Sequence, residues 1–189
     1  MNKKTEKNKF LKNEITTLSI DGGFSRGYVY RSDPKVSDKG KEEFKKYIRK
    51  LINEYYFKFT NIYSKYNSEQ LEKEYIGDIK YFKSAINNKF KDKHILADNN
   101  FRIGNTQKIL NLYLKYLWCL GYIEYEPPHC PVDSNIIKEL GEKIKWTKID
   151  DIEIYLDLIY KIKNLAKNKN ETIAQWELKL WNDKIVNNE

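Results

Sequence analysis

Apolar residues recur every three or four positions along most of the chain. This spacing is typical of amphipathic helices, and it continues from about residue 37 to the last stretch of the sequence. The expected helices begin near Ser37, Ser68, Asn105, Asn135, Thr147 and Thr172. Thr172-Ile173-Ala174-Gln175 also has the form of a capping box. The pattern predicts a mostly α protein with a single helical domain over residues 15–189.

The first 34 residues lack this clear helical spacing. Residues 1–14 are polar and rich in lysine, and we expect a flexible basic arm there. Residues 16–34 contain the β-forming run Tyr28-Val29-Tyr30 and three glycines. This composition predicts a short irregular or β-hairpin segment before the helical part.

The most apolar stretch spans residues 103–123. Between Ile109 and Leu120 only Asn111 and Lys115 are strongly polar. A helix that is apolar over most of its circumference belongs in the middle of a bundle. We expect Asn105 to cap its start and Gly121 to end it in the left-handed conformation.

A polar stripe interrupts this apolar helix. Lys108, Asn111, Lys115 and Cys119 follow one another at intervals of three, four and four residues, so they share one face. The stripe is either the solvated face of the helix or a buried strip that faces a cleft. Periodicity does not distinguish these two interpretations.

The loop that follows, PPHCPVDSNII at residues 127–137, concentrates rare residue types. It holds three of the four prolines, one of the two histidines and one of the two cysteines. Prolines restrict the backbone and hold a side chain in place at low entropic cost. Asp133 precedes a short predicted helix at 135–140, where it fits an ordinary N-cap. A capping carboxylate is also oriented, so the structural and functional readings of Asp133 are compatible.

Composition narrows the possible classes. Hydrophobic residues make up 40% and charged residues 33% of 189 positions, which is typical of a globular domain. The sequence has no apolar run long enough to span a membrane, and two cysteines make no disulfide framework, so we expect a cytoplasmic protein. The net charge of +8 favours DNA or RNA as a partner, although abundant lysine, asparagine and isoleucine are also typical of an AT-rich genome.

No cofactor or metal is expected. Cys119, Cys130, His94 and His129 have no recognised metal-ligand spacing. DGGFSRG at residues 21–27 lacks the spacing and the lysine-hydroxyl ending of a phosphate-binding loop.

Residues 100–142 resemble the core of helix-hairpin-helix DNA glycosylases. The likeness rests on GNTQK at 104–108, a long apolar helix ending in Leu-Gly, a proline-containing loop and PVDSNII at 131–137. Asn100-Phe101-Arg102-Ile103-Gly104 replaces the family's usual leucine-proline-glycine turn. The resemblance implies that Asp133 is the catalytic aspartate. It also implies that Lys108 or Lys115 is the lysine of a bifunctional enzyme, and this choice stays open.

The resemblance further implies a DNA-binding surface and a base pocket. The expected DNA contacts are Arg102, Asn105, Gln107, Ser134 and Asn135. The expected residues of the base pocket are Trp118, Cys119, His129 and Trp176. The predicted protein is a monomeric DNA glycosylase that excises a damaged or modified base, in DNA repair or in defence against foreign DNA. The alternative is a helical domain that binds nucleic acid or a protein without catalysis.

Overall fold

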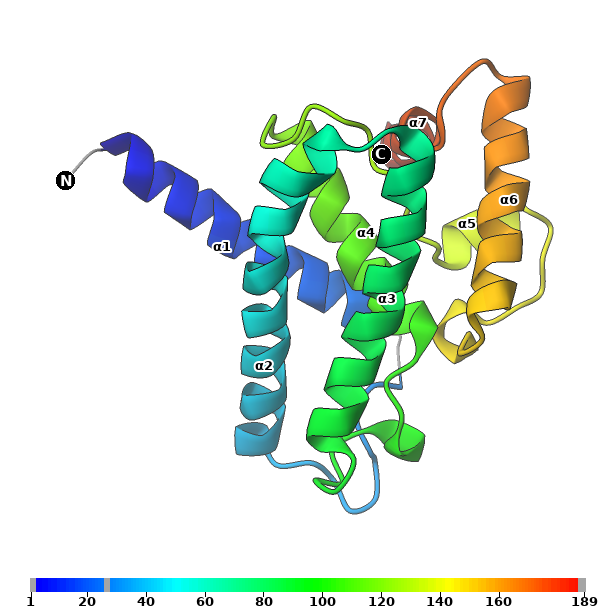
Figure 1. Cartoon of the computed structure of the whole chain (residues 1–189). Coiled ribbons are helices and arrows are strands. Elements are labelled where there is room, and N and C mark those ends of the chain that lie inside the picture. The colour runs from blue at the N-terminus through cyan, green and yellow to red at the C-terminus, as the bar shows by residue number, and fades with distance from the viewer. Residues whose placement is uncertain (1–2, 26–27, 187–189) are drawn as a thin grey trace.

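The structure is a computed structural model that describes residues 3–25 and 28–186, and within them the chain is predominantly helical (Figure 1). The α-helices are α1 (Lys3–Phe24), α2 (Asp38–Phe57), α3 (Ser68–Phe90), α4 (Ile103–Cys119), α5 (Ser134–Glu139), α6 (Ile152–Asn168) and α7 (Ile173–Val186). Short helical turns are η1 (Lys58–Ile62), η2 (Tyr63–Lys65), η3 (Ala97–Asn99) and η4 (Trp146–Lys148). The prediction of a mostly α single domain is confirmed.

Helices α2 and α3 form an antiparallel pair whose starts are fixed by local capping (Figure 1). The Ser37 side chain accepts a hydrogen bond from the Gly40 amide, as expected for an N-cap. At α3 the cap is Asn67, one residue before the predicted position, and it forms a capping box with Gln70.

Helix α4 is the central element, as its composition predicts. Every residue from Ile103 to Asn111 is buried. The helix begins two residues earlier than predicted, with Arg102 as N-cap, so Asn105 lies inside the first turn and is no cap. Gly121, at φ +70°, follows the C-terminal turn in the expected left-handed conformation.

The N-terminal segment differs from the prediction of a loose arm and an irregular or hairpin segment. Residues 3–24 form one helix, α1, whose first half projects from the body (Figure 1). Its second half packs on α4 through a face that mixes Ile15 and Ile20 with buried Thr16 and Ser19. Small and hydroxyl-bearing residues obscure the apolar stripe in the sequence. Of the predicted β segment, a single isolated bridge between Tyr30 and Leu96 forms in the described residues.

Glycines allow α1 to approach α4 closely. A Cβ added at Gly23 would lie 2.2 Å from Cγ1 of Ile109. In the same region the Asn105 side-chain amide donates a hydrogen bond of 2.9 Å to the Gly23 carbonyl. Gly22 and Gly23, which lie in the segment predicted to be irregular or a β-hairpin, therefore pack α1 against α4.

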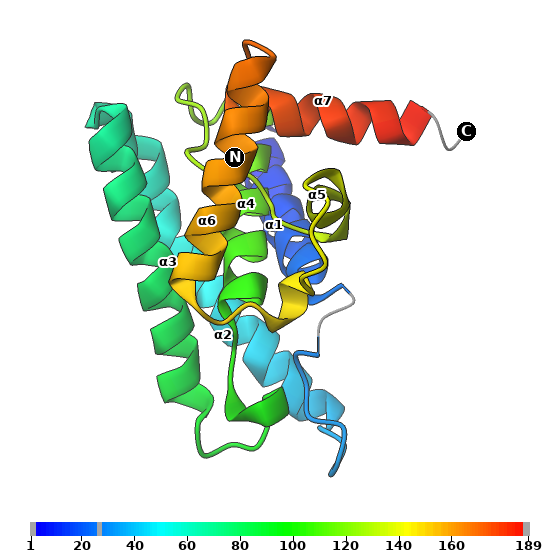
Figure 2. The same ribbon diagram turned by 90° about the vertical axis from the view of Figure 1, so that its right-hand side faces the viewer.

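The C-terminal third covers the other sides of α4. Figure 2 shows α5 and α3 on opposite sides of α4, and α7 running outward toward the C-terminus. Asp133 caps the start of α5, as predicted, and Gly141, at φ +68°, follows its C-terminal turn. No helix in the described part of the chain is long and apolar enough to cross a membrane.

Candidate functional site

The polar stripe of α4 is largely buried, which decides between the two readings of it. Lys108 and Asn111 are buried and Lys115 is mostly buried, whereas Cys119 at the end of the helix is exposed. Buried polar groups are costly unless they are paired. Each of the three buried side chains is in fact held by specific partners, so this face is no solvated surface.

Two amide side chains of α4 fix the proline-rich loop. Gln107 donates to the Val132 carbonyl at 2.7 Å and accepts from the Val132 amide at 3.0 Å. Asn111 donates to the Cys130 carbonyl at 2.8 Å. These bonds hold the backbone on both sides of Pro131 against α4, immediately before Asp133.

A buried network supports the same loop from behind. Asn111 accepts a hydrogen bond from the Tyr75 hydroxyl at 2.5 Å and donates to the Tyr155 hydroxyl at 3.0 Å. The two ring nitrogens of His129 lie 2.9 Å from that Tyr155 oxygen and 3.2 Å from Oε1 of Glu72. Burial lowers the pKa of His129. The hydrogen bond from His129, together with Lys163, lowers the pKa of Glu72 to about 2.

Asp133 is the N-cap of α5 and also faces Lys108. Its Oδ1 accepts from the backbone amides of Asn135 at 2.9 Å and Ile136 at 3.3 Å. Its Oδ2 lies 3.5 Å from Nζ of Lys108. The same Lys108 nitrogen lies 4.5 Å from the centroid of the Trp146 ring, a cation–π distance. One carboxylate oxygen is thus used for capping and the other is directed toward the lysine.

Lys115 pairs with a residue that the sequence did not single out. Its Nζ lies 2.7 and 3.0 Å from the two carboxylate oxygens of Glu177 on α7, and 5.3 Å from the ring centroid of Trp181. Desolvation raises the pKa of Glu177. One signal was present in the sequence, because Glu177 interrupts the apolar face formed by Ile173, Trp176 and Leu180.

These groups surround one cavity of about 210 Å³, which we call the Asp133 cavity. Helices α1, α4 and α7 and the proline-rich loop form its walls. The lining residues are Leu18, Gly22, Ser25, Lys108, Leu112, Lys115, Tyr116, Pro131, Asp133, Glu177 and Trp181. The structure therefore brings Asp133 and both candidate lysines to a single enclosed space.

The predicted DNA contacts fall into two groups. Arg102, Asn105 and Gln107 are buried, and their side chains are bound to Asp98, to the Gly23 carbonyl and to Val132. They are structural residues rather than surface groups available to phosphate. Ser134 and Asn135 are exposed at the start of α5, beside Asp133.

The predicted base-pocket residues do not line the Asp133 cavity. His129 and Trp176 are buried elsewhere, Trp118 is half-buried, and Cys119 is exposed. The aromatic residues of the cavity wall are Trp181 and Tyr116 instead. Lys115 on α4 contacts Glu177 and Trp181 of α7, so the exposed Trp181 lies at the cavity, whereas Trp176 is buried in the core.

No group of three or more metal-ligating side chains occurs among the residues that the structure describes. Comparisons with known proteins give no assignment. No family model matches the chain, and no match is found among the curated proteins or the solved structures.

Proposed function

We propose that the protein is a DNA glycosylase that excises a damaged or modified base into the Asp133 cavity. The observation that carries this proposal is the convergence of Asp133, Lys108 and Lys115 on one enclosed space. An oriented carboxylate can support cleavage of an N-glycosidic bond, a neighbouring lysine can supply an alternative nucleophile, and an aromatic wall can stack on the base. The likeness of residues 100–142 to the helix-hairpin-helix family agrees with this set.

The carboxylate has a defined part in this chemistry. When the bond between C1′ of the sugar and the base nitrogen breaks, the electron pair leaves with the base and positive charge develops on the sugar. A fixed negative charge stabilises that transition state. Two backbone amides hold Asp133 at 2.9 and 3.3 Å, so its position is set before substrate arrives. Water then adds to C1′, and Asp133 is placed to accept the proton that this water loses.

A lysine that acts as the nucleophile would add a second outcome. A neutral amine that attacks C1′ displaces the base and forms an imine with the opened sugar, from which the strand is cleaved. Lys108 lies nearest Asp133, at 3.5 Å, while Lys115 is bound by Glu177. The geometry supports Lys108 as the nucleophile beside Asp133. It supports Lys115 as the partner of Glu177 in a buried ion pair.

The test is a comparison of two N-cap aspartates. Asp133→Asn keeps the shape and much of the capping ability but removes the charge. Asp151→Asn makes the same change at the N-cap of α6, where the exposed Asp151 accepts from the Glu153 amide at 2.9 Å away from the cavity. Each protein is incubated with DNA duplexes that carry single damaged or modified bases, and abasic sites are scored after alkali cleavage. We expect Asp133→Asn to lose about a hundredfold or more in rate and Asp151→Asn to keep wild-type activity.

The lysines are separated in the same assay. Borohydride reduction traps an imine between protein and DNA, and we expect Lys108→Gln to abolish trapping while Lys115→Gln retains it. Equal excision by wild type and Asp133→Asn would show that Asp133 is only a cap. DNA binding without excision of any base would support the non-catalytic alternative.

A further inference from the structure

A second hollow lies beside the Asp133 cavity and has a different character. It has a volume of about 580 Å³, and we call it the lysine groove. Its apolar lining comes from Ile137, Ile144 and Trp146, and Tyr28 stands beside it with 68% of its surface exposed. Three lysines also line the groove: Lys138, Lys143 and Lys145.

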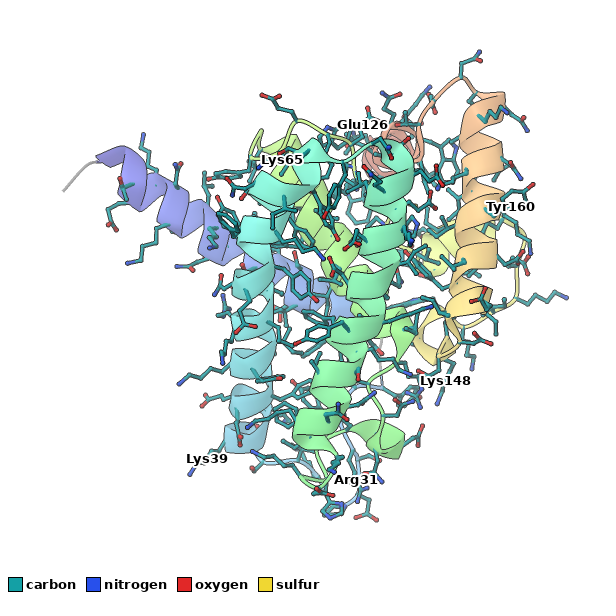
Figure 3. The ribbon with its side chains drawn as sticks, in the orientation of Figure 1. Arg31, Lys39, Lys65, Glu126, Lys148 and Tyr160 are labelled. Atoms are coloured by element: carbon teal, nitrogen blue, oxygen red, sulfur yellow. The ribbon has the colours of Figure 1, made fainter. Side chains whose placement is uncertain are left out.

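The charge of this groove is strongly positive. Lys138, Lys143 and Lys145 are exposed, and none forms an ion pair within the part of the chain that the structure describes. The acidic residue of the lining, Glu142, is paired with Lys161 at 2.7 Å. Lys148, the last residue of η4, is labelled below α6 in Figure 3; its Nζ lies 5.3 Å from the ring centroid of Tyr28 and 3.8 Å from Oδ2 of Asp98.

The groove and the Asp133 cavity share their dividing wall. Ser134 lines the groove, and its neighbour Asp133 lines the cavity. The Trp146 ring likewise belongs to the groove and lies 4.5 Å from Nζ of Lys108, which lines the cavity. A polymer bound in the groove therefore contacts Ser134, the residue next to Asp133 in the chain.

We propose that the lysine groove binds the DNA strand that carries the target nucleotide, and that Tyr28 stacks on a base next to it. Unpaired lysines match the charge of a phosphate backbone, and an exposed aromatic ring provides a sequence-independent stacking surface. An apolar floor with a cationic rim suits a strand with its bases partly unstacked. The part of this inference that concerns the target nucleotide rests on the proposed glycosylase function. The binding of DNA to the groove can be tested independently of any excision activity.

The experiment measures DNA affinity as a function of salt. A labelled 20-nucleotide strand, alone and as a duplex, is titrated with wild type and with Lys138→Gln/Lys143→Gln/Lys145→Gln. Loss of three phosphate contacts lowers the slope of log affinity against log salt by about two to three, and we expect at least tenfold weaker binding at low salt. Tyr28→Ala is expected to weaken binding to the single strand by about tenfold and to leave the salt slope unchanged.

A matched variant separates a site from net charge. The control variant Lys39→Gln/Lys46→Gln/Lys65→Gln also removes three positive charges, but from exposed positions outside the groove. Of these, Lys39 and Lys65 lie away from Lys148 (Figure 3). We expect this variant to bind as the wild type does. Equal losses in both triple variants, or an unchanged salt slope in the groove variant, would overturn the proposal.

The outcomes also distinguish this inference from the proposed function. Groove-dependent DNA binding by a protein that excises no base leaves the inference standing and removes the glycosylase. Excision that persists undiminished, with unchanged affinity, in the groove variant removes the inference and leaves the glycosylase. If the wild type binds no DNA at low salt, the inference fails.

Discussion

The ion pair of Lys115 and Glu177 is the most deeply buried of those in contact with the Asp133 cavity. The two side chains are only 12% and 8% exposed. Taking both charges out of water is costly, and their mutual attraction offsets that cost only while both are present. A buried pair of this kind contributes little net stability, whereas removal of one partner is strongly destabilising because it leaves the other charge buried alone.

A double-mutant cycle tests this coupling. Glu177→Leu leaves the Lys115 ammonium buried without its carboxylate, and we expect the free energy of unfolding to fall by about 3 kcal/mol or more. Lys115→Met is expected to lower the free energy of unfolding by a similar amount. In the double variant Lys115→Met/Glu177→Leu both charges are gone, so the loss should be much smaller than the sum. Urea unfolding at pH 7 gives the values, and additive costs would contradict the pairing.

At the scale of elements, α4 fixes several neighbours at once. Its amide side chains hold the loop before Asp133. In its first turn the backbone at Gly104 lies so close to η4 that no side chain would fit at this position. The Gly104 amide donates to the Ile149 carbonyl at 2.8 Å, and a Cβ at Gly104 would lie 2.0 Å from the Trp146 carbonyl oxygen. Since the Trp146 ring covers Lys108, the approach of η4 to α4 also shapes the candidate site.

Two glycine substitutions are expected to have opposite effects. Gly104→Ala forces η4 away from α4 and should destabilise the protein by about 2 kcal/mol, the usual scale for overpacking. Gly77→Ala lies in the middle of α3, where nothing is within 4 Å of the added Cβ, and should stabilise the helix by about 1 kcal/mol. Thermal unfolding measures both. Stabilisation by Gly104→Ala would show that η4 is not packed against α4 as described.

At the scale of the whole molecule, stability and the site share one buried polar network. The network of Asn111, Tyr155, His129 and Glu72 links α4, α6, the proline-rich loop and α3. Because the loop carries Asp133, a change that loosens the network also moves the candidate catalytic group. Global stability is thus the readout that reports on the network.

The network makes stability depend on pH through His129. Burial lowers the folded-state pKa of His129 below 6.5, so the unfolded chain binds a proton near pH 6.5 while the folded protein does not. Stability is therefore present at pH 7 and is lost as the pH falls below about 6.5, by up to about 1.4 kcal/mol per pH unit. We expect the free energy of unfolding, measured with urea, to depend less on pH between pH 7 and 5.5 in His129→Gln than in the wild type.

The second histidine is the control. His94 is exposed, so His94→Gln should keep the wild-type pH dependence. If His129→Gln and wild type lose stability in parallel between pH 7 and 5.5, the buried His129 is not the responsible group.

Local interactions made much of the fold predictable. The caps at Ser37, Asp133 and Thr172 and the left-handed glycines at 121 and 141 each depend on residues within one helical turn. The helical period and the near absence of polar residues likewise placed 103–119 at the centre of the bundle. These features needed no knowledge of distant contacts.

Long-range packing decided the rest. The second half of α1 packs on α4, whose Leu112 and Ile109 lie directly against Gly22 and Gly23. Contacts with residues outside α4 hold the three predicted DNA-contact residues at its start: Asp98 binds Arg102, Gly23 of α1 binds Asn105 and Val132 of the loop binds Gln107. The position of α7 pairs Lys115 with Glu177 and places Trp181 rather than Trp176 at the cavity. The sequence by itself determined the main helices after residue 37 and that Asp133 begins a helix. Only the tertiary structure decided that Asp133, Lys108 and Lys115 face one cavity, because that requires the proline-rich loop to pack on α4, with Asp133 meeting Lys108 from 25 positions away along the chain.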